Sequence, residues 1–117
     1  MKIKTRKLKV GPHLYTVQWL TGEQYDKKHS NWDKGSTVGC CHLSMLRIDI
    51  RMDLEEGPVA TTKLQETLLH EVIHAVWSSS GLTDGGTEEA NVTALSPALL
   101  DTFHRNPWLL AELQPAA

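Results

Sequence analysis

Two histidines one helical turn apart constrain this chain more than any other feature. They stand in the segment Leu68-Leu69-His70-Glu71-Val72-Ile73-His74-Ala75-Val76-Trp77. On an α-helix, residues i and i+4 lie one above the other, so His70 and His74 can direct two imidazoles to one point. A tetrahedral zinc ion binds such nitrogens at about 2.0–2.1 Å. The segment therefore predicts a helix that carries two ligands of one zinc ion per chain.

Glu71 follows the first histidine and completes the pattern H-E-x-x-H. In this pattern the glutamate is placed to take a proton from a water molecule that the metal activates, and the chemistry is metal-assisted hydrolysis. The alternative is an amphipathic core helix that carries two surface histidines without a metal. We favour the metal site, with Glu71 as the catalytic base.

The active-site helix is expected over residues 60–80. Thr62 and Gln65 fit a capping box, with Thr62 as the N-cap. A second helix is expected over 87–105, with Val92, Leu95 and Leu99 on its buried side. Pro97 either kinks this helix or begins a new one, and Asn106-Pro107 ends it. The tail, residues 108–117, can add a last docked turn before it frays.

The first part of the chain, residues 1–53, has mainly strand character. Residues 2–10 and 13–20 form a plausible hairpin about Gly11-Pro12, and the polar stretch 21–36 reads as a loop with a helical turn near 24–28. Strands follow at 37–43 and 46–52. In the latter, alternating apolar and charged residues predict a half-buried antiparallel strand.

These elements predict a single domain, residues 1–117, of the α+β class. Its sheet, antiparallel or mixed and of about three or four strands, would pack on the active-site helix. A length of 117 residues, with 40% apolar and 22% charged residues, suits one modest core.

Charge and hydropathy exclude several function classes. The formal net charge of -2 predicts no general attraction to nucleic acid or membranes. The basic residues at 2–9 read as the solvated face of a strand, with a nucleic-acid patch as the weaker alternative. The chain has neither the apolar region of a signal peptide nor a run of 18 apolar residues, so we expect a cytoplasmic protein. Adjacent Cys40 and Cys41 are expected to be reduced thiols in a strand.

A catalytic zinc ion usually has three protein ligands, so one remains to be found. A carboxylate on the second helix is the natural donor, and Glu88 and Glu89 both stand in its first turn. Helical phase does not decide between these two. Further candidates are Asp84, Asp101 and His104. For His104 we favour a simple role at the helix C-terminus over binding metal or stabilising an oxyanion. His13, His29 and His42 have no ligand spacing and are treated as ordinary.

The segment Thr67-Leu68-Leu69-His70-Glu71-Val72-Ile73-His74-Ala75 resembles the active-site helix of the zincin metallopeptidases. The downstream Glu88-Glu89 gives it a gluzincin-like form. Together with Arg105-Asn106-Pro107, the pattern is similar to small H-E-x-x-H proteins encoded by bacteriophages and prophages, and more distantly to SprT-like domains. A phage-encoded chain would act in the host cytoplasm.

The resemblance covers roughly residues 38 to 110 and implies a minimal zincin fold. His70 and His74 would be zinc ligands, Glu71 the general base, and Glu88 or Glu89 the third ligand. SprT-like proteins use a third histidine there, which weakens any transfer of their DNA-linked role.

The sequence therefore predicts a zinc metallopeptidase that acts on a peptide or protein. We expect the substrate to pair with an edge strand, for which residues 46–53, including Ile48 and Ile50, are the candidate. The alternative is a structural or regulatory zinc-binding protein of phage type that keeps the fold without catalysis. The oligomeric state is not determined by the sequence.

Overall fold

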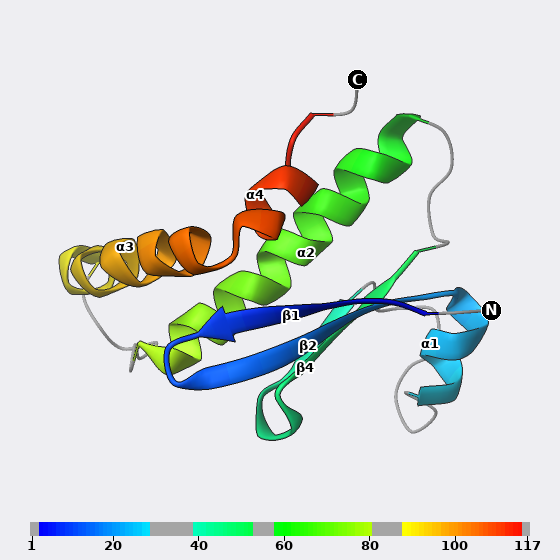
Figure 1. Cartoon of the computed structure of the whole chain (residues 1–117), viewed down its shortest axis with the longest axis horizontal. Helices are drawn as coiled ribbons and strands as arrows, with labels where there is room; N and C mark the ends of the chain where they lie inside the picture. The colour runs from blue at the N-terminus through cyan, green and yellow to red at the C-terminus, as the bar shows by residue number, and fades with distance from the viewer. Residues whose placement is uncertain (1–2, 29–38, 53–57, 81–87, 116–117) are drawn as a thin grey trace.

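The computed structural model describes residues 3–28, 39–52, 58–80 and 88–115. In these ranges the chain folds as an α+β domain, a four-stranded mixed sheet with helices packed on it, which confirms the expected class (Figure 1). The elements in chain order are β1 (Lys4–Val10), β2 (His13–Leu20), α1 (Gly22–Lys28), β3 (Gly39–His42), β4 (Arg47–Arg51), α2 (Pro58–Ser79), α3 (Glu88–Arg105) and α4 (Pro107–Glu112).

The first two strands form the expected hairpin. β1 and β2 pair antiparallel from Lys4 opposite Trp19 to Val10 opposite His13. Gly11 turns the chain with a φ of +54°, a conformation that glycine adopts at little cost. Leu8 and Val10 are buried while the basic residues of β1 are exposed, which confirms a strand whose basic side chains are in solvent.

β4 lies inside the sheet, and this differs from the prediction. The strand order is β1-β2-β4-β3, with β4 parallel to β2 and antiparallel to β3. The prediction of an edge strand over 46–53 is therefore wrong. The alternating pattern of β4 predicted one buried and one solvent-exposed face. The buried face is confirmed, because Ile48 and Ile50 are fully buried, but Asp49 on the other face is fully buried as well. Alternation reports which faces are apolar and carries no information about neighbouring strands.

Ion pairs occupy the face of β4 that points away from α2. Asp49 Oδ2 lies 3.0 Å from Arg47 Nε and 3.5 Å from His42 Nε2. Arg51 Nη1 donates to Asp26 Oδ1 of α1 at 3.0 Å. A buried carboxylate needs such partners to offset its lost hydration, which explains how an acidic residue is accommodated in a central strand.

α2 crosses the sheet and buries Leu68, Val72, Ala75 and Val76 against it. The helix begins at Pro58, so the prediction of Thr62 as N-cap is wrong and Thr62 lies in its second turn. Proline is well suited to the first helical position because its fixed φ is helical and its missing N–H has no intrahelical partner there. The expected end of the helix near residue 80 is confirmed.

α3 runs through Pro97 as one helix, so the alternative in which Pro97 begins a new helix is wrong. The helix ends before Asn106, as predicted. Its N-terminal half, yellow in Figure 1, extends beyond the β1–β2 turn. For that reason Val92, expected to be buried, is 49% exposed, and Leu95 and Leu99 are only half-buried. α4 is the docked last turn that the sequence predicted.

The corner between α3 and α4 closes the outer edge of β1. Asn106 Oδ1 accepts a hydrogen bond from the Lys9 N–H, and its Nδ2 donates to the Lys9 carbonyl, both at 2.9 Å. Trp108 Nε1 donates to the Lys7 carbonyl at 2.9 Å. These contacts satisfy backbone groups that an open edge strand would offer to another chain.

Replacing Asn106 with alanine tests this corner. Asn106 is buried and also donates to the Thr102 carbonyl, so Asn106→Ala leaves three backbone groups without their partner. We expect the free energy of unfolding to fall by about 2–4 kcal/mol, measured by urea titration. The exposed Gln114→Ala, which removes one local bond to Leu110, should change it by less than about 1 kcal/mol. Equal effects of the two variants would contradict this role of Asn106.

Candidate metal site

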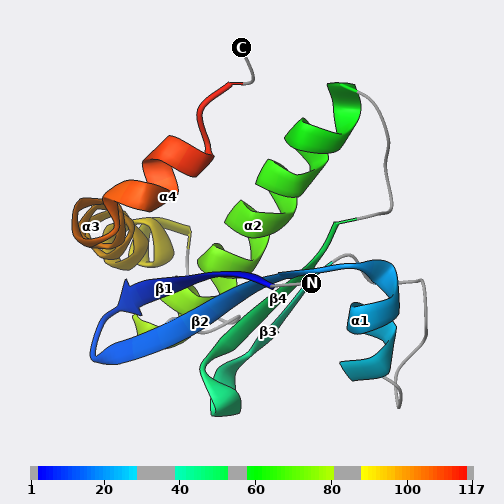
Figure 2. The ribbon, with the colours of Figure 1, turned by 45° about the vertical axis from the view of Figure 1, so that its right-hand side comes forward.

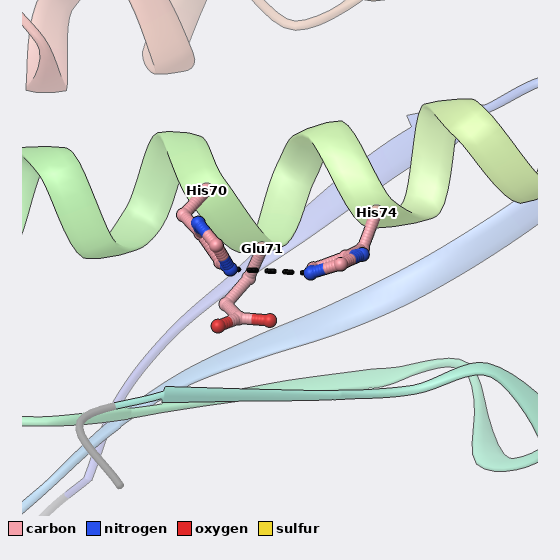
Figure 3. Close-up of side chains that lie close together, drawn as sticks. All are labelled: His70, Glu71 and His74. Atoms are coloured by element: carbon pink, nitrogen blue, oxygen red, sulfur yellow. Dashed lines mark hydrogen bonds between the residues drawn. The ribbon is translucent and has the colours of Figure 1, made fainter. Parts of the chain in front are cut away.

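His70 and His74 stand on one flank of α2 with their rings facing each other (Figure 3). Their Nε2 atoms are 3.1 Å apart, and the ring planes are inclined at 75°. Without a metal this distance permits a hydrogen bond, in which one ring donates and the other accepts. Both side chains are exposed, so the nitrogens are accessible to an ion from solvent.

The nitrogen separation fits two ligands of one metal ion. Two nitrogens at about 2.0–2.1 Å from a tetrahedral zinc ion are roughly 3.3 Å apart. One carboxylate oxygen of Glu71 joins them, and the three potential ligand atoms all lie within 4.8 Å of one another. The group of His70, Glu71 and His74 could therefore hold a metal ion.

Glu71 occupies the border between the exposed flank and the core. Its side chain is only 6% exposed, and Figure 3 shows the carboxylate reaching from α2 toward the strands. Burial raises the pKa of the Glu71 carboxyl above its usual value, while the imidazoles of His70 and His74 act in the opposite direction. A carboxylate with a raised pKa is a stronger base than an ordinary glutamate.

β3 lies directly against this carboxylate. A side chain at Gly39 would place its Cβ 3.1 Å from Glu71 Oε2 and 2.7 Å from the Thr67 methyl carbon. Only a glycine allows the strand to approach α2 this closely. Our interpretation of the sequence missed Gly39, although a glycine at the start of a strand is a typical sign of close backbone approach.

The two cysteines of β3 are reduced thiols, as predicted. Burial, reinforced by the charge of Glu71, raises the pKa of Cys40 to about 11 and that of Cys41 to about 12. Both thiols therefore stay protonated near neutral pH in the metal-free protein.

The structure does not bring Glu88, Glu89 or His104 to the histidine pair. All three are exposed side chains on α3, and among the described residues the metal-binding group holds only His70, Glu71 and His74. The second helix lies on the opposite flank of α2. On that flank, Gln65 Nε2 donates hydrogen bonds to the carbonyls of Glu112 and Gln114 at the end of α4. Val76, also on that flank, lines a cavity together with residues of α3. At roughly 100° per residue, Gln65 and Val76 are close to half a turn away from the histidines.

The remaining sequence candidates have other positions. Asp101 is exposed and accepts from Arg105 Nη1 at 3.3 Å, and His13 is exposed at the β1–β2 turn. Asp84 and His29 lie outside the described residues. Ile48 and Ile50 are covered by the core and do not reach the site. β3, and not β4, is the outer strand at this side of the sheet: among the described residues it pairs with a strand on one side only.

No family model, curated protein or solved structure matches this chain. The likeness to zincin metallopeptidases therefore depends on the sequence residues quoted for it. Among the described ranges, no helix is long and apolar enough to span a membrane.

The raised pKa of Glu71 predicts a pH-dependent stability of the metal-free protein. Because the folded chain favours protonated Glu71, this contribution to stability is complete below the pKa of the unfolded chain and is lost as pH rises through the folded pKa. Glu71→Gln stays neutral at every pH. With a chelator present, we expect its melting temperature to exceed that of the wild type at about pH 8 and to match it at about pH 4.

Glu66→Gln is the matched control, because Glu66 is an exposed glutamate of the same helix, 3.5 Å from Lys63. The difference in melting temperature between Glu66→Gln and the wild type should be the same at about pH 4 and at about pH 8. A Glu71→Gln protein that melts below the wild type at the higher pH would contradict the proposed burial cost.

The close approach at Gly39 predicts a clash when a methyl group is added. Gly39→Ala should lower the free energy of unfolding by about 1–3 kcal/mol, because the Thr67 methyl and Glu71 must both shift. Thr67→Ser removes that methyl group, so the double variant should recover part of the loss in a denaturation cycle. Additive losses would show that Thr67 and Gly39 do not interact in this way.

Proposed function

We propose that this protein is a zinc-dependent metallopeptidase, with His70 and His74 as zinc ligands and Glu71 as general base. The observation that carries the proposal is the 3.1 Å separation of the two Nε2 atoms with the buried Glu71 carboxylate beside them. The H-E-x-x-H spacing, the helical setting and the neighbouring sheet edge all support the same chemistry.

Each of the three side chains has a distinct task in this proposal. The imidazoles of His70 and His74 would hold the ion through Nε2 in their neutral form. A zinc ion bound there would act as a Lewis acid that lowers the pKa of water toward about 7 and polarises the scissile carbonyl. The Glu71 carboxylate accepts the proton from the attacking water and delivers it to the leaving amine. Its raised pKa favours the first transfer, because it makes the carboxylate a stronger base than an ordinary glutamate.

The substrate strand is best accommodated beside β3. The opposite edge of the sheet, at β1, is closed by Asn106 and Trp108, whereas β3 is the outer strand next to Glu71. An extended peptide that paired with residues 39–42 would run close to the carboxylate, since the Gly39 backbone already lies against Glu71. This replaces the earlier expectation of a substrate strand at Ile48 and Ile50.

The third ligand distinguishes the peptidase from its alternative, a zinc-binding protein without catalysis. If Glu71 itself binds the metal, the two histidines and the glutamate supply three protein ligands, and no carboxylate of this group is left to act as the base. The exposed positions of Glu88 and Glu89, away from the histidines, favour this second candidate. If Glu71 is the base, it keeps its proton-accepting role and another group completes the coordination.

Zinc content and peptide cleavage, measured on the same variants, separate these functions. We expect one zinc ion per wild-type chain and chelator-sensitive cleavage of an unfolded, labelled polypeptide. Glu71→Gln should keep the zinc and lower the cleavage rate by roughly 10²–10⁴-fold, and His74→Ala should lose both. Exposed His13→Ala is the matched histidine control and should keep both.

Each other outcome has a defined meaning. A wild-type protein without stoichiometric zinc would contradict both zinc functions. Loss of zinc in Glu71→Gln would identify Glu71 as a ligand and favour the non-catalytic protein. Loss of zinc in Glu89→Gln or Glu88→Gln would show that α3 completes the coordination despite its position.

A further inference from the structure

α3 carries an exposed stripe on the side that faces away from the rest of the domain. Its two most exposed large apolar residues are Val92, at 49%, and Leu100, at 56%. They are eight residues apart, and the exposed residues between them follow the helical spacing of three or four that places side chains on one face. The stripe consists of Glu89, Val92, Thr93, Ser96, Leu100 and His104, all exposed.

The opposite side of α3 makes the contacts with the domain. Ala94, Ala98, Asp101 and Thr102 line a small cavity that α3 shares with α2 and the β1–β2 turn. Figure 2 looks nearly along α3 and shows the sheet and α2 on one side of this helix only. The stripe is therefore not part of the packing that holds α3 in place.

We propose that a second copy of this chain binds to this stripe, with the two α3 helices packed antiparallel. The polar residues at the two ends of the stripe support this partner, because a carboxylate accepts a hydrogen bond from an imidazole N–H. Glu89 lies in the acidic first turn of α3 and His104 in its basic last turn. In an antiparallel pair, Glu89 of each copy faces His104 of the other, and the opposed helix dipoles attract as well.

The spacing of the apolar residues fits the same pairing. A two-fold axis between Ser96 and Pro97 places Glu89 and His104 at matching heights, because the axis is midway between them in sequence. The same axis places Thr93 of one copy at the height of Leu100 of the other, and Val92 at the height of Asp101. Burying Val92 and Leu100 removes the apolar surface that the isolated domain leaves in water.

The interface would be small. An 18-residue helix is about 27 Å long, and one helix pair buries less surface than a standard stable interface. We therefore expect a weak dimer that forms as the protein concentration increases. The inference does not depend on the proposed function. α3 and the histidine pair lie on opposite flanks of α2, so the metal site stays accessible in the dimer.

Sedimentation equilibrium over a range of concentrations tests the proposal. The mass of the wild type should rise from 13.1 kDa toward twice that value with increasing concentration. Leu100→Lys should remain at the monomer mass throughout. Met45→Lys changes an equally exposed apolar residue in the turn before β4 and should dimerise like the wild type. A wild type that stays monomeric, or an effect of Met45→Lys equal to that of Leu100→Lys, would overturn the proposal.

Charge reversal tests the antiparallel arrangement. His104→Glu should weaken the dimer, since it places two carboxylates together at each end of the helix pair. Adding Glu89→Lys should restore it, because the exchanged charges again face each other. Circular dichroism confirms that both exposed variants keep the fold. A double variant that is as weak as His104→Glu alone would rule out this pairing.

Discussion

The packing of α2 on the central strands determines how every other part of the domain is placed. Leu68 and Val72 of α2 meet Val17 of β2 and Ile48 and Ile50 of β4 in the core, and all five side chains are almost fully buried. Each such side chain contributes about 1.5–3 kcal/mol when it leaves water. Because β4 is an interior strand, both neighbours hold it in register beneath the helix.

This packing also fixes the rotation of α2 about its axis. With Leu68 and Val72 directed at the sheet, His70 and His74 are turned to the exposed flank. Glu71 is left at the boundary, where it is 6% exposed. Burying a carboxylate costs free energy, and the raised pKa of Glu71 is the direct consequence. The burial of the apolar core residues therefore offsets the free energy that it costs to bury the Glu71 carboxylate.

The two edges of the sheet have different surroundings, and the difference bears on function. The corner of α3 and α4 satisfies the outer backbone groups of β1 through Asn106 and Trp108. β3, at the other end, contacts α2 at the level of the metal-binding group through Gly39. Among the described residues, β3 has a strand partner on one side only. The outer strand β3 of the sheet therefore lies beside the group of His70, Glu71 and His74.

The sequence by itself determined the local features, because each of them depends on periodicity or on single residues. Helical spacing was enough to place His70, Glu71 and His74 on α2, and period-two alternation identified Ile48 and Ile50 as core residues. Gly11-Pro12 was enough for the hairpin and Asn106-Pro107 for the end of α3. Only the tertiary structure decided which elements are neighbours: the interior position of β4, the approach of Gly39 to Glu71, and the distance of Glu88 and Glu89 from the histidines. Strand order and the flank on which a helix packs depend on contacts between residues far apart in sequence, which no local pattern encodes.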